Sequence, residues 1–306
     1  MLYYHYQFFE VENMTVKSFI EKNTKSLVGK TVAVTGTTGG LGKELCKHLA
    51  ALHANLILMD RNKSRSAEFA NSLRESFPDI SVKLITIDLS DFESVKRATE
   101  ELNLEDVDVF IHNAGAYSIP RCTTDLGLDN VFTINFASPY YMVRELLPLL
   151  RKRNGHVVAV GSIAHNYSKT DSSDIDFKTR KRASLVYGNA KRYLMFALHE
   201  LFKNESEATL SVTHPGISFT NITAHYPKLI FAVIKYPMKI IFMKPKKASL
   251  SILKGVFEKT ESYSWIGPRI FNVWGFPKKK KLKTAKSDEI KLIAEIAEDL
   301  YKKQKT

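Results

Sequence analysis

Short apolar runs alternate with amphipathic stretches along most of the chain. Six of these runs have the length of buried strands, and most of them are rich in β-branched residues. They lie at 31–35, 55–59, 82–87, 107–111, 156–160 and 210–213. Apolar residues at helical spacing between them predict helices, the longest at about 127–150 and 186–204. This alternation predicts an α/β fold: a parallel, doubly wound sheet of about seven strands, helices on both faces, and a ligand over the carboxyl ends of the strands.

The last third of the chain has a different pattern. Residues 221–247 are apolar and aromatic but interrupted by prolines and lysines, so they predict a lid rather than a membrane span. From Ser287 onward, amphipathic spacing predicts a helix that either docks on the core or lies on a membrane. We therefore divide the chain into an extension at 1–27, a single domain at 28–277, and a basic linker with this helix at 278–306.

A glycine-dense turn follows the first predicted strand. Gly36, Gly40 and Gly42 allow a tight turn, close approach to a pyrophosphate, and a helix from Lys43 whose free N–H groups face the anion. The turn therefore predicts a site for a phosphate-bearing ligand. Taken alone, such a turn is equally consistent with a simple connection between a strand and a helix.

Asp60 and Arg61 end the second predicted strand, about twenty positions beyond the turn. A carboxylate there can accept both ribose hydroxyls of an adenosine and repels a 2′-phosphate, which favours NAD(H). The neighbouring guanidinium can hold a phosphate, so NADP(H) or dual use stays open. The alternative for both residues is a solvated strand end.

Tyr187 and Lys191 are four residues apart in a predicted helix, so their side chains project from the same face. A nearby ammonium and an oxidised nicotinamide would favour the phenolate and lower the tyrosine pKa toward the working pH. Tyr187 is thus a candidate general acid and base. The pair alone is common by chance, and its alternative is an exposed helix face.

These features occur in an order that resembles the short-chain dehydrogenase/reductase family of the classical type, over about residues 28–225. The matching positions are Thr35-Gly36-x-x-x-Gly40-x-Gly42, Asp88, Asn113-Ala114-Gly115, Asn135, Ser162, Tyr187-x-x-x-Lys191, and Pro215-Gly216 with Thr220. The resemblance implies a Rossmann-type fold and an NAD(P)(H)-dependent oxidoreductase. Its substrate would be an alcohol, aldehyde or ketone, and the apolar segment 221–247 suggests a fairly apolar one.

The resemblance also implies roles for individual residues. Tyr187 would pass a proton to or from the substrate oxygen, and Ser162 would orient that oxygen. Lys191 would hold the nicotinamide ribose and lower the tyrosine pKa, and Asn135 would anchor a water beside Lys191. The cofactor contacts implied are Gly36, Thr38, Gly40, Leu41, Gly42, Asp60, Arg61, Asp88, Leu89, Asn113, Ala114, Gly115, Lys191, Pro215, Gly216 and Thr220.

Some positions depart from the family pattern without removing a catalytic atom. His112 replaces a frequent asparagine, Gly161 a frequent serine, and Ala137-Ser138 a position that often holds glycine. Because Tyr187 already fills the proton-transfer role, we expect His112, His165 and His214 to be structural. The segment from Ser162 to His165 and a late Trp-Gly-x-Pro are similar to the branch of retinol dehydrogenases and WW-domain oxidoreductases.

Two other functions stay open. A sensor or scaffold would bind the dinucleotide without turnover, which the complete set of four catalytic positions argues against. A sugar-nucleotide epimerase or dehydratase shares the Tyr-x-x-x-Lys pair but typically has a larger C-terminal domain and a different turn spacing. Homo-oligomers are usual in the family, so the resemblance implies one here.

Charge and cysteine content limit the partners and the cellular location that we expect. The 45 Lys and Arg against 32 Asp and Glu give a formal charge of +13, with lysines crowded at 244–247 and 278–283. No nucleic-acid-binding or metal-ligand spacing accompanies them, so we expect no nucleic acid and no metal, only a basic tail with weak contact to anionic membranes. Cys46 and Cys122 are the only cysteines, and the N-terminus lacks the pattern of a signal peptide, which favours a reducing, cytoplasmic location.

Overall fold

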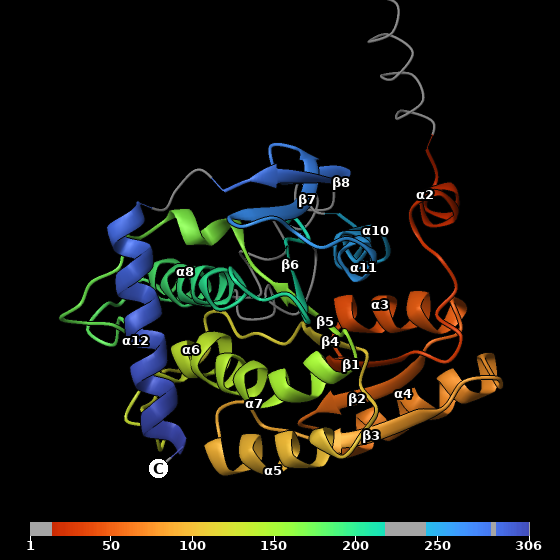
Figure 1. Cartoon of the computed structure of the whole chain (residues 1–306), viewed down its shortest axis with the longest axis horizontal. Helices are drawn as coiled ribbons and strands as arrows, with labels where there is room; N and C mark the ends of the chain where they lie inside the picture. The colour runs from red at the N-terminus through yellow and green to blue at the C-terminus, as the bar shows by residue number, and fades with distance from the viewer. Residues whose placement is uncertain (1–13, 218–242, 283–285, 306) are drawn as a thin grey trace, which may run out of the picture.

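The computed structural model describes residues 14–217, 243–282 and 286–305, which form an eight-stranded sheet between two layers of helices (Figure 1). The strand order is β3-β2-β1-β4-β5-β6-β7-β8. The strands are β1 Thr31–Thr35, β2 Asn55–Asp60, β3 Val82–Thr86, β4 Val109–His112, β5 His156–Val160, β6 Thr209–Thr213, β7 Ser264–Ile270 and β8 Trp274–Lys281. The first seven are parallel, and β8 pairs antiparallel with β7. The predicted doubly wound sheet is confirmed, with one added edge strand.

The direction in which strands are added to the sheet reverses at β1. From β1 the chain adds β2 and then β3 on one side, and it crosses back to place β4 on the other side. Ala33 in β1 is therefore paired with both Ile57 in β2 and Phe110 in β4. In open α/β sheets such a reversal is where ligands bind, outside the carboxyl ends of the strands.

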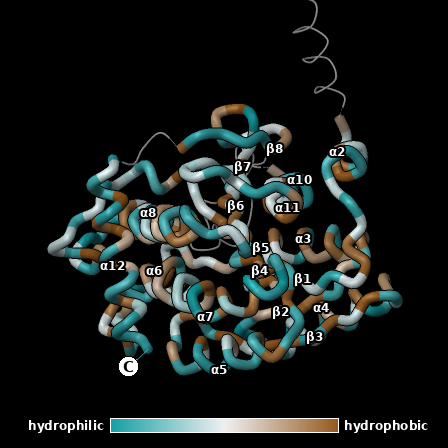
Figure 2. Tube along the Cα trace, in the orientation of Figure 1, coloured by the Kyte–Doolittle hydropathy of each residue, from teal (hydrophilic) through white to brown (hydrophobic). Residues whose placement is uncertain are grey.

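Alternate strand residues face two separate apolar layers. In β1, Val32 and Val34 face one layer and Ala33 faces the other. The first layer includes α2 Val16–Asn23, α3 Gly40–Ala51, α4 Lys63–Ser76 and α11 Leu250–Phe257, and the second includes α5 Phe92–Asn103, α7 Ser138–Lys152, α8 Ala183–Leu201 and α12 Ser287–Lys305. Figure 2 shows the hydrophobic residues gathered along the strands and on the helices packed against them.

One predicted helix differs in detail. The helix predicted at 127–150 is divided into α6 Asn130–Phe132, a π-helix η1 Thr133–Ala137, and α7. The spacing of apolar residues cannot reveal the π-helix, because its wider turn spans only five residues and hardly changes that spacing. A 3₁₀-helix, η2 Ile163–Asn166, follows β5. The short helix α10 Pro245–Ala248 precedes α11.

The C-terminal segment docks on the core. Helix α12 buries Ile290, Ile293 and Ala297 in the same apolar layer as α7 and α8. Strand β8 extends to Lys281, so the linker predicted to begin at residue 278 starts inside a strand. Most of the predicted lid at 221–247 lies outside the described residues. Among the described residues, no helix is long and apolar enough to cross a membrane.

Candidate active site

The turn between β1 and α3 is compact enough to require glycine. Gly36 has φ +74°, and a Cβ on Gly42 would lie 2.2 Å from the Gly36 carbonyl oxygen. Gly40 is exposed, and among the described residues the nearest atom to a Cβ placed there would be Pro245 Cγ at 3.8 Å. No side chain caps α3 at Gly39, which leaves the first N–H groups of the helix available to an anion. The turn is thus tight against its own backbone and open toward a ligand.

Asn113 joins the carboxyl ends of β1 and β4 beside this turn. Its Nδ2 donates to the carbonyls of Thr35 (3.0 Å) and Gly36 (3.1 Å). The N–H groups of Asn113 and Ala114 both donate to Thr35 Oγ1. The remaining acceptor, Asn113 Oδ1, is buried and has no partner among the described residues. An unpaired buried acceptor beside a glycine turn fits a bound dinucleotide, which would supply a donor.

Asp60 has a different role from the one predicted. Its carboxylate accepts hydrogen bonds from Thr37 Oγ1, Thr38 N (3.0 Å), Thr38 Oγ1 (3.1 Å) and Ser66 Oγ (3.2 Å). The residue is only 5% exposed. Asp60 therefore holds the glycine turn in place, and the free carboxylate expected for the ribose hydroxyls is not present in this structure. The sequence alone did not indicate this role of Asp60, because the prediction did not consider that other side chains of the protein could donate hydrogen bonds to its carboxylate.

Arg61, by contrast, is exposed at the same strand end. Its Nη1 lies 3.7 Å from Asp88 Oδ2, and its side chain is 76% exposed. Asp88 also accepts from Ser90 N at 2.9 Å, while the Leu89 carbonyl accepts from Ser138 Oγ at 2.8 Å. The pair of Arg61 and Asp88 thus borders the carboxyl ends of β2 and β3, where an adenosine would lie.

Helix α8 and strand β5 bring three predicted catalytic residues together. The Ser162 hydroxyl, at the carboxyl end of β5, hydrogen-bonds the Tyr187 phenol. Lys191 Nζ lies 5.8 Å from the centre of the Tyr187 ring and donates to the Val160 carbonyl at 2.9 Å. Tyr117 packs edge-on against Tyr187, with ring centres 5.3 Å apart. The predicted shared face of Tyr187 and Lys191 is what the structure shows.

Asn135 and Gly115 complete this cluster. Asn135 lies in the π-helix, and its Nδ2 donates to the carbonyls of Ala116 and Val131, both at 2.8 Å. A Cβ on Gly115 would lie 2.8 Å from Asn135 Oδ1 and 3.6 Å from Lys191 Nζ. Only glycine leaves room for these groups to meet. A water anchored by Asn135 stays a prediction.

The pKa values of the central pair move in opposite directions. Removal from water raises the pKa of Tyr187 to about 12, although the hydrogen bond from Ser162 acts to lower it. Burial lowers the pKa of Lys191 to about 7. The predicted lowering of the tyrosine pKa by the lysine is therefore not found in the protein alone. Lys191 donates a hydrogen bond to the Val160 carbonyl and is partly neutral near pH 7. Its effect on the pKa of the Tyr187 phenol is therefore weak.

The segment after β6 supplies the last predicted contacts. Gly216 has φ +80°, and a Cβ there would lie 2.6 Å from the Val273 carbonyl oxygen, so the turn between β7 and β8 covers it. His214 Nε2 contacts the Asn272 carbonyl at 3.1 Å beside Pro215. Thr220 lies outside the described residues.

The three histidines that were expected to be structural are all buried. Burial lowers the pKa of His165 to about 4 and that of His214 to about 3, and it also lowers the pKa of His112 well below its ordinary value. Each ring is therefore neutral at physiological pH. Because they are neutral and buried, we do not assign any of them the role of general acid, which stays with Tyr187.

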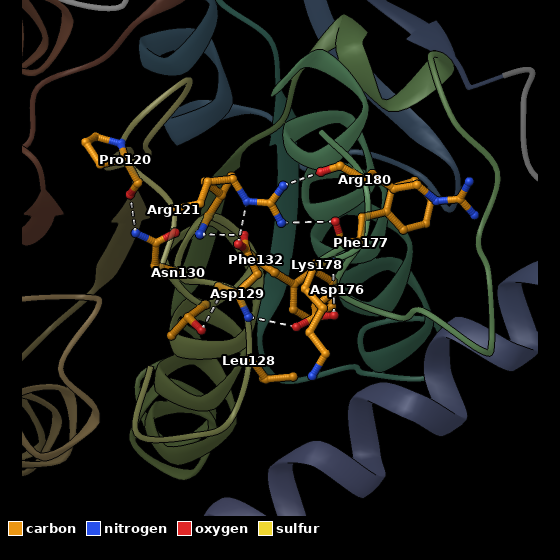
Figure 3. Close-up of polar contacts among 12 residues, drawn as sticks. Pro120, Arg121, Leu128, Asp129, Asn130, Phe132, Asp176, Phe177, Lys178 and Arg180 are labelled. Carbon is orange, nitrogen blue, oxygen red and sulfur yellow. Dashed lines mark hydrogen bonds and ion pairs between the residues drawn. The ribbon is translucent and has the colours of Figure 1, made fainter. Parts of the chain in front are cut away.

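A polar cluster around Arg121 was not anticipated (Figure 3). Arg121 Nε donates to Asp129 Oδ2 at 2.6 Å, and its other nitrogens donate to the carbonyls of Phe177 and Arg180. Asp129 N in turn donates to Asp176 Oδ2 at 2.7 Å. The cluster joins the loop after β4 to the loop before α8. Its partners are about fifty residues apart, so no local pattern in the sequence indicates it.

A small cluster of apolar side chains lies beside Tyr187. Phe177, Val131 and Val186 are buried together, and Ile119 and Leu185 pack against them. Tyr187 also packs against this group. The phenol therefore has a polar neighbour in Ser162 and an apolar wall beside it.

Comparison with known proteins agrees with this geometry. Residues 30–173 match the family model of short chain dehydrogenases. Retinol dehydrogenase 14 of Mus musculus is 29% identical over 212 residues, covering 64% of each chain. The WW domain-containing oxidoreductase of Pongo abelii is 29% identical, covering 65% of this chain and 51% of its own. The chain thus spans less than two thirds of these relatives.

Solved structures share the fold. An uncharacterized protein from Mycobacterium paratuberculosis superposes with a TM-score of 0.70 at 23% identity, covering 92% of this chain and 96% of its own. L-Sorbose reductase from Gluconobacter frateurii, solved with NADPH and L-sorbose, gives 0.60 at 19% identity, covering 85% and 99%. In sequence and in fold the chain is similar to the short-chain dehydrogenase/reductase family of oxidoreductases, and the curated relatives that it matches include retinol dehydrogenases and WW domain-containing oxidoreductases.

Proposed function

We propose that the protein transfers a hydride between a nicotinamide cofactor and the carbon of an alcohol or carbonyl substrate. The hydrogen bond between Ser162 and Tyr187 carries this proposal, because it presents two hydroxyl groups to one substrate oxygen. Lys191 lies one helical turn from Tyr187, on the side of Gly115 and Asn135. A protein that only held a dinucleotide would have no use for this arrangement.

The chain's residues would hold the cofactor along the carboxyl edge of β1, β4 and β5. The glycine turn and the start of α3 would take the pyrophosphate, and Asn113 Oδ1 would accept a hydrogen bond. The bound nicotinamide would supply or accept the hydride. We extend the proposal to both NAD(H) and NADP(H), because Asp60 is engaged by four donors while the Arg61 guanidinium is exposed.

The protein groups would handle the proton. In the direction of reduction, the Tyr187 phenol donates its proton to the substrate oxygen as the hydride arrives at carbon, and the Ser162 hydroxyl orients that oxygen. A pKa of about 12 keeps Tyr187 protonated, which suits a general acid. In oxidation Tyr187 must first become a base, and we propose that the positive charge of the oxidised cofactor, with Lys191, favours the phenolate.

The apolar wall beside Tyr187 supports a fairly apolar substrate. Phe177 and Val186 are buried there, and Ile119, Leu185 and Tyr187 are partly buried against the same group. Relatives in the same branch are named for retinol, an apolar alcohol. We therefore propose long-chain or cyclic alcohols and their aldehydes or ketones as the first substrates to assay.

A matched pair of tyrosine variants tests the proposal. Tyr187→Phe should fold and bind cofactor yet lose turnover by about a hundredfold to ten-thousandfold, the range that a general acid typically contributes. Tyr193→Phe is the control, because Tyr193 lies in the same helix and its hydroxyl has no partner among the described residues. Absorbance of the reduced nicotinamide follows the rate. Unchanged turnover in Tyr187→Phe would contradict the proposal, and dinucleotide binding without turnover in the unmodified protein would favour the sensor.

Two aspects of the setting are also proposals. We propose weak contact with anionic membranes through the basic C-terminal third, where Lys278 and Lys281 of β8 are exposed. Co-sedimentation that is equal for anionic and neutral vesicles would contradict it. We also propose that the protein works in the cytoplasm as a homo-oligomer, for which a monomeric mass by sedimentation would be the contrary result.

A further inference from the structure

Arg192 follows Lys191 directly in α8 and joins three parts of the molecule. Its Nε and Nη2 donate to the two carboxylate oxygens of Glu289 in α12, at 2.7 and 2.5 Å. Its Nη1 donates to the His165 carbonyl at 3.1 Å. The Arg192 side chain is 3% exposed and that of Glu289 is 16% exposed. One guanidinium thus ties the helix of Tyr187 to α12 and to the turn after β5.

The same turn carries Ser162. His165 donates twice to the Ser162 carbonyl, from its backbone N at 3.2 Å and from its ring Nδ1 at 2.7 Å. Because this acceptor requires a donor and the ring is neutral, Nδ1 carries the proton. The Ser162 hydroxyl also accepts from Ala164 N at 3.2 Å, so its position follows that of the turn.

Glu289 holds the far end of this segment as well. Its Oε1 accepts from the Thr170 N–H at 2.8 Å. Partial burial acts to raise the pKa of Glu289, but the hydrogen bonds from Arg192 and Thr170 outweigh it and lower the pKa to about 2. The carboxylate is therefore ionised throughout the working range of pH. A buried guanidinium needs such a partner, since an unpaired buried charge is costly.

We propose that Glu289 is a positioning residue for the reaction: through Arg192 and His165 it fixes Ser162 at hydrogen-bonding distance from Tyr187. This inference rests on the proposed function. It makes α12 part of the support of the active site, because the helix supplies the carboxylate that holds the serine turn against α8. Since the bond from Ser162 lowers the pKa of Tyr187, a loosened turn should raise that pKa.

Two carboxylates of α12 provide a matched comparison. Glu298 lies in the same helix but bonds the Tyr140 hydroxyl at 2.5 Å and Arg144, both in α7 and away from the serine turn. Glu289→Gln should lower kcat about tenfold, with the dissociation constant of NADH or NADPH within about twofold, because the glycine turn is untouched. The apparent pKa of kcat for alcohol oxidation should move to higher pH. Glu298→Gln should change neither kcat nor the pH profile, even if it lowers thermal stability as much.

Two further measurements distinguish a failure of this inference from a failure of the proposed function and from misfolding. Glu289→Asp keeps the charge beside Arg192, so it should fold and restore part of the lost kcat. Hydrogen exchange in the segment 163–170 should be faster in Glu289→Gln than in Glu298→Gln. If the unmodified protein turns over no alcohol or carbonyl, the proposed function fails while exchange still tests the contacts. Equal exchange in the two variants, or equal kcat and pH profile in an active enzyme, would overturn the inference.

Discussion

Replacing Lys191 with methionine should make the folded protein more stable at low pH while removing its activity. Lys191 is buried, 2% exposed, and its pKa falls from the ordinary value of 10.5 to about 7. Each pH unit is worth about 1.4 kcal/mol, so keeping Lys191 charged in the folded state costs up to about 5 kcal/mol below pH 7. Hydration and local rearrangement reduce such costs, and we expect Lys191→Met to gain about 2–4 kcal/mol at pH 6.

The sign of the pH dependence follows from proton binding. The unfolded chain keeps the lysine proton up to about pH 10.5, whereas the folded protein releases it near pH 7. Between these values unfolding takes up a proton, so this group makes the free energy of unfolding rise with pH by up to about 1.4 kcal/mol per unit. The advantage of Lys191→Met should therefore shrink from pH 7 to pH 9. The missing donor to the Val160 carbonyl takes about 1 kcal/mol off this advantage at every pH.

Urea unfolding at pH 6, 7, 8 and 9 measures this difference. Taking the difference between the two proteins cancels every group that titrates alike in both. A constant difference in the free energy of unfolding across this range would refute the reasoning, as would a less stable Lys191→Met at pH 6. Lost turnover together with greater stability would identify Lys191 as a group retained for function at a cost to the fold.

Two further substitutions test the site. Gly115→Ala should lower kcat at least about tenfold, because its Cβ would lie 2.8 Å from Asn135 Oδ1. Gly267→Ala should keep nearly full activity, since the nearest atoms of the described residues, in His214, would lie 3.5 Å from its Cβ. Similar rates in both variants would contradict the packing argument. Arg61→Ala should weaken NADPH binding about tenfold and leave NADH binding within about twofold, as measured by fluorescence titration; equal weakening of both would show that Arg61 does not recognise the 2′-phosphate.

Local patterns in the sequence identified the elements that hold the site. The apolar run ending at Thr35 and the glycines after it specify β1, its turn and the start of α3, because each requirement lies within a dozen residues. The spacing of Tyr187 and Lys191 fixed their common face for the same reason. The C-terminal helix docks on the core because α7 and α8 offer an apolar surface to it. Its own amphipathic pattern could not distinguish this from a helix that lies on a membrane.

The rest depended on contacts between distant residues. The Asp60 carboxylate accepts hydrogen bonds from Thr37 and Thr38, which are more than twenty positions away. The role predicted for Asp60 at the ribose did not take these donors into account. The pKa of Tyr187 depends on its burial, which no spacing gives. Glu289 lies 97 positions from Arg192 and looked like one more acidic residue in the first turn of a helix.

Transfer of a labelled hydride tests the central claim most directly. NADH and NADPH carrying deuterium at nicotinamide C4 would be incubated with the protein and a panel of apolar aldehydes and ketones, and the alcohols analysed by mass spectrometry. We predict that one label appears on the carbinol carbon, and that Tyr187→Phe abolishes the transfer while Tyr193→Phe preserves it. Tight cofactor binding with no deuterium in any product would contradict the account.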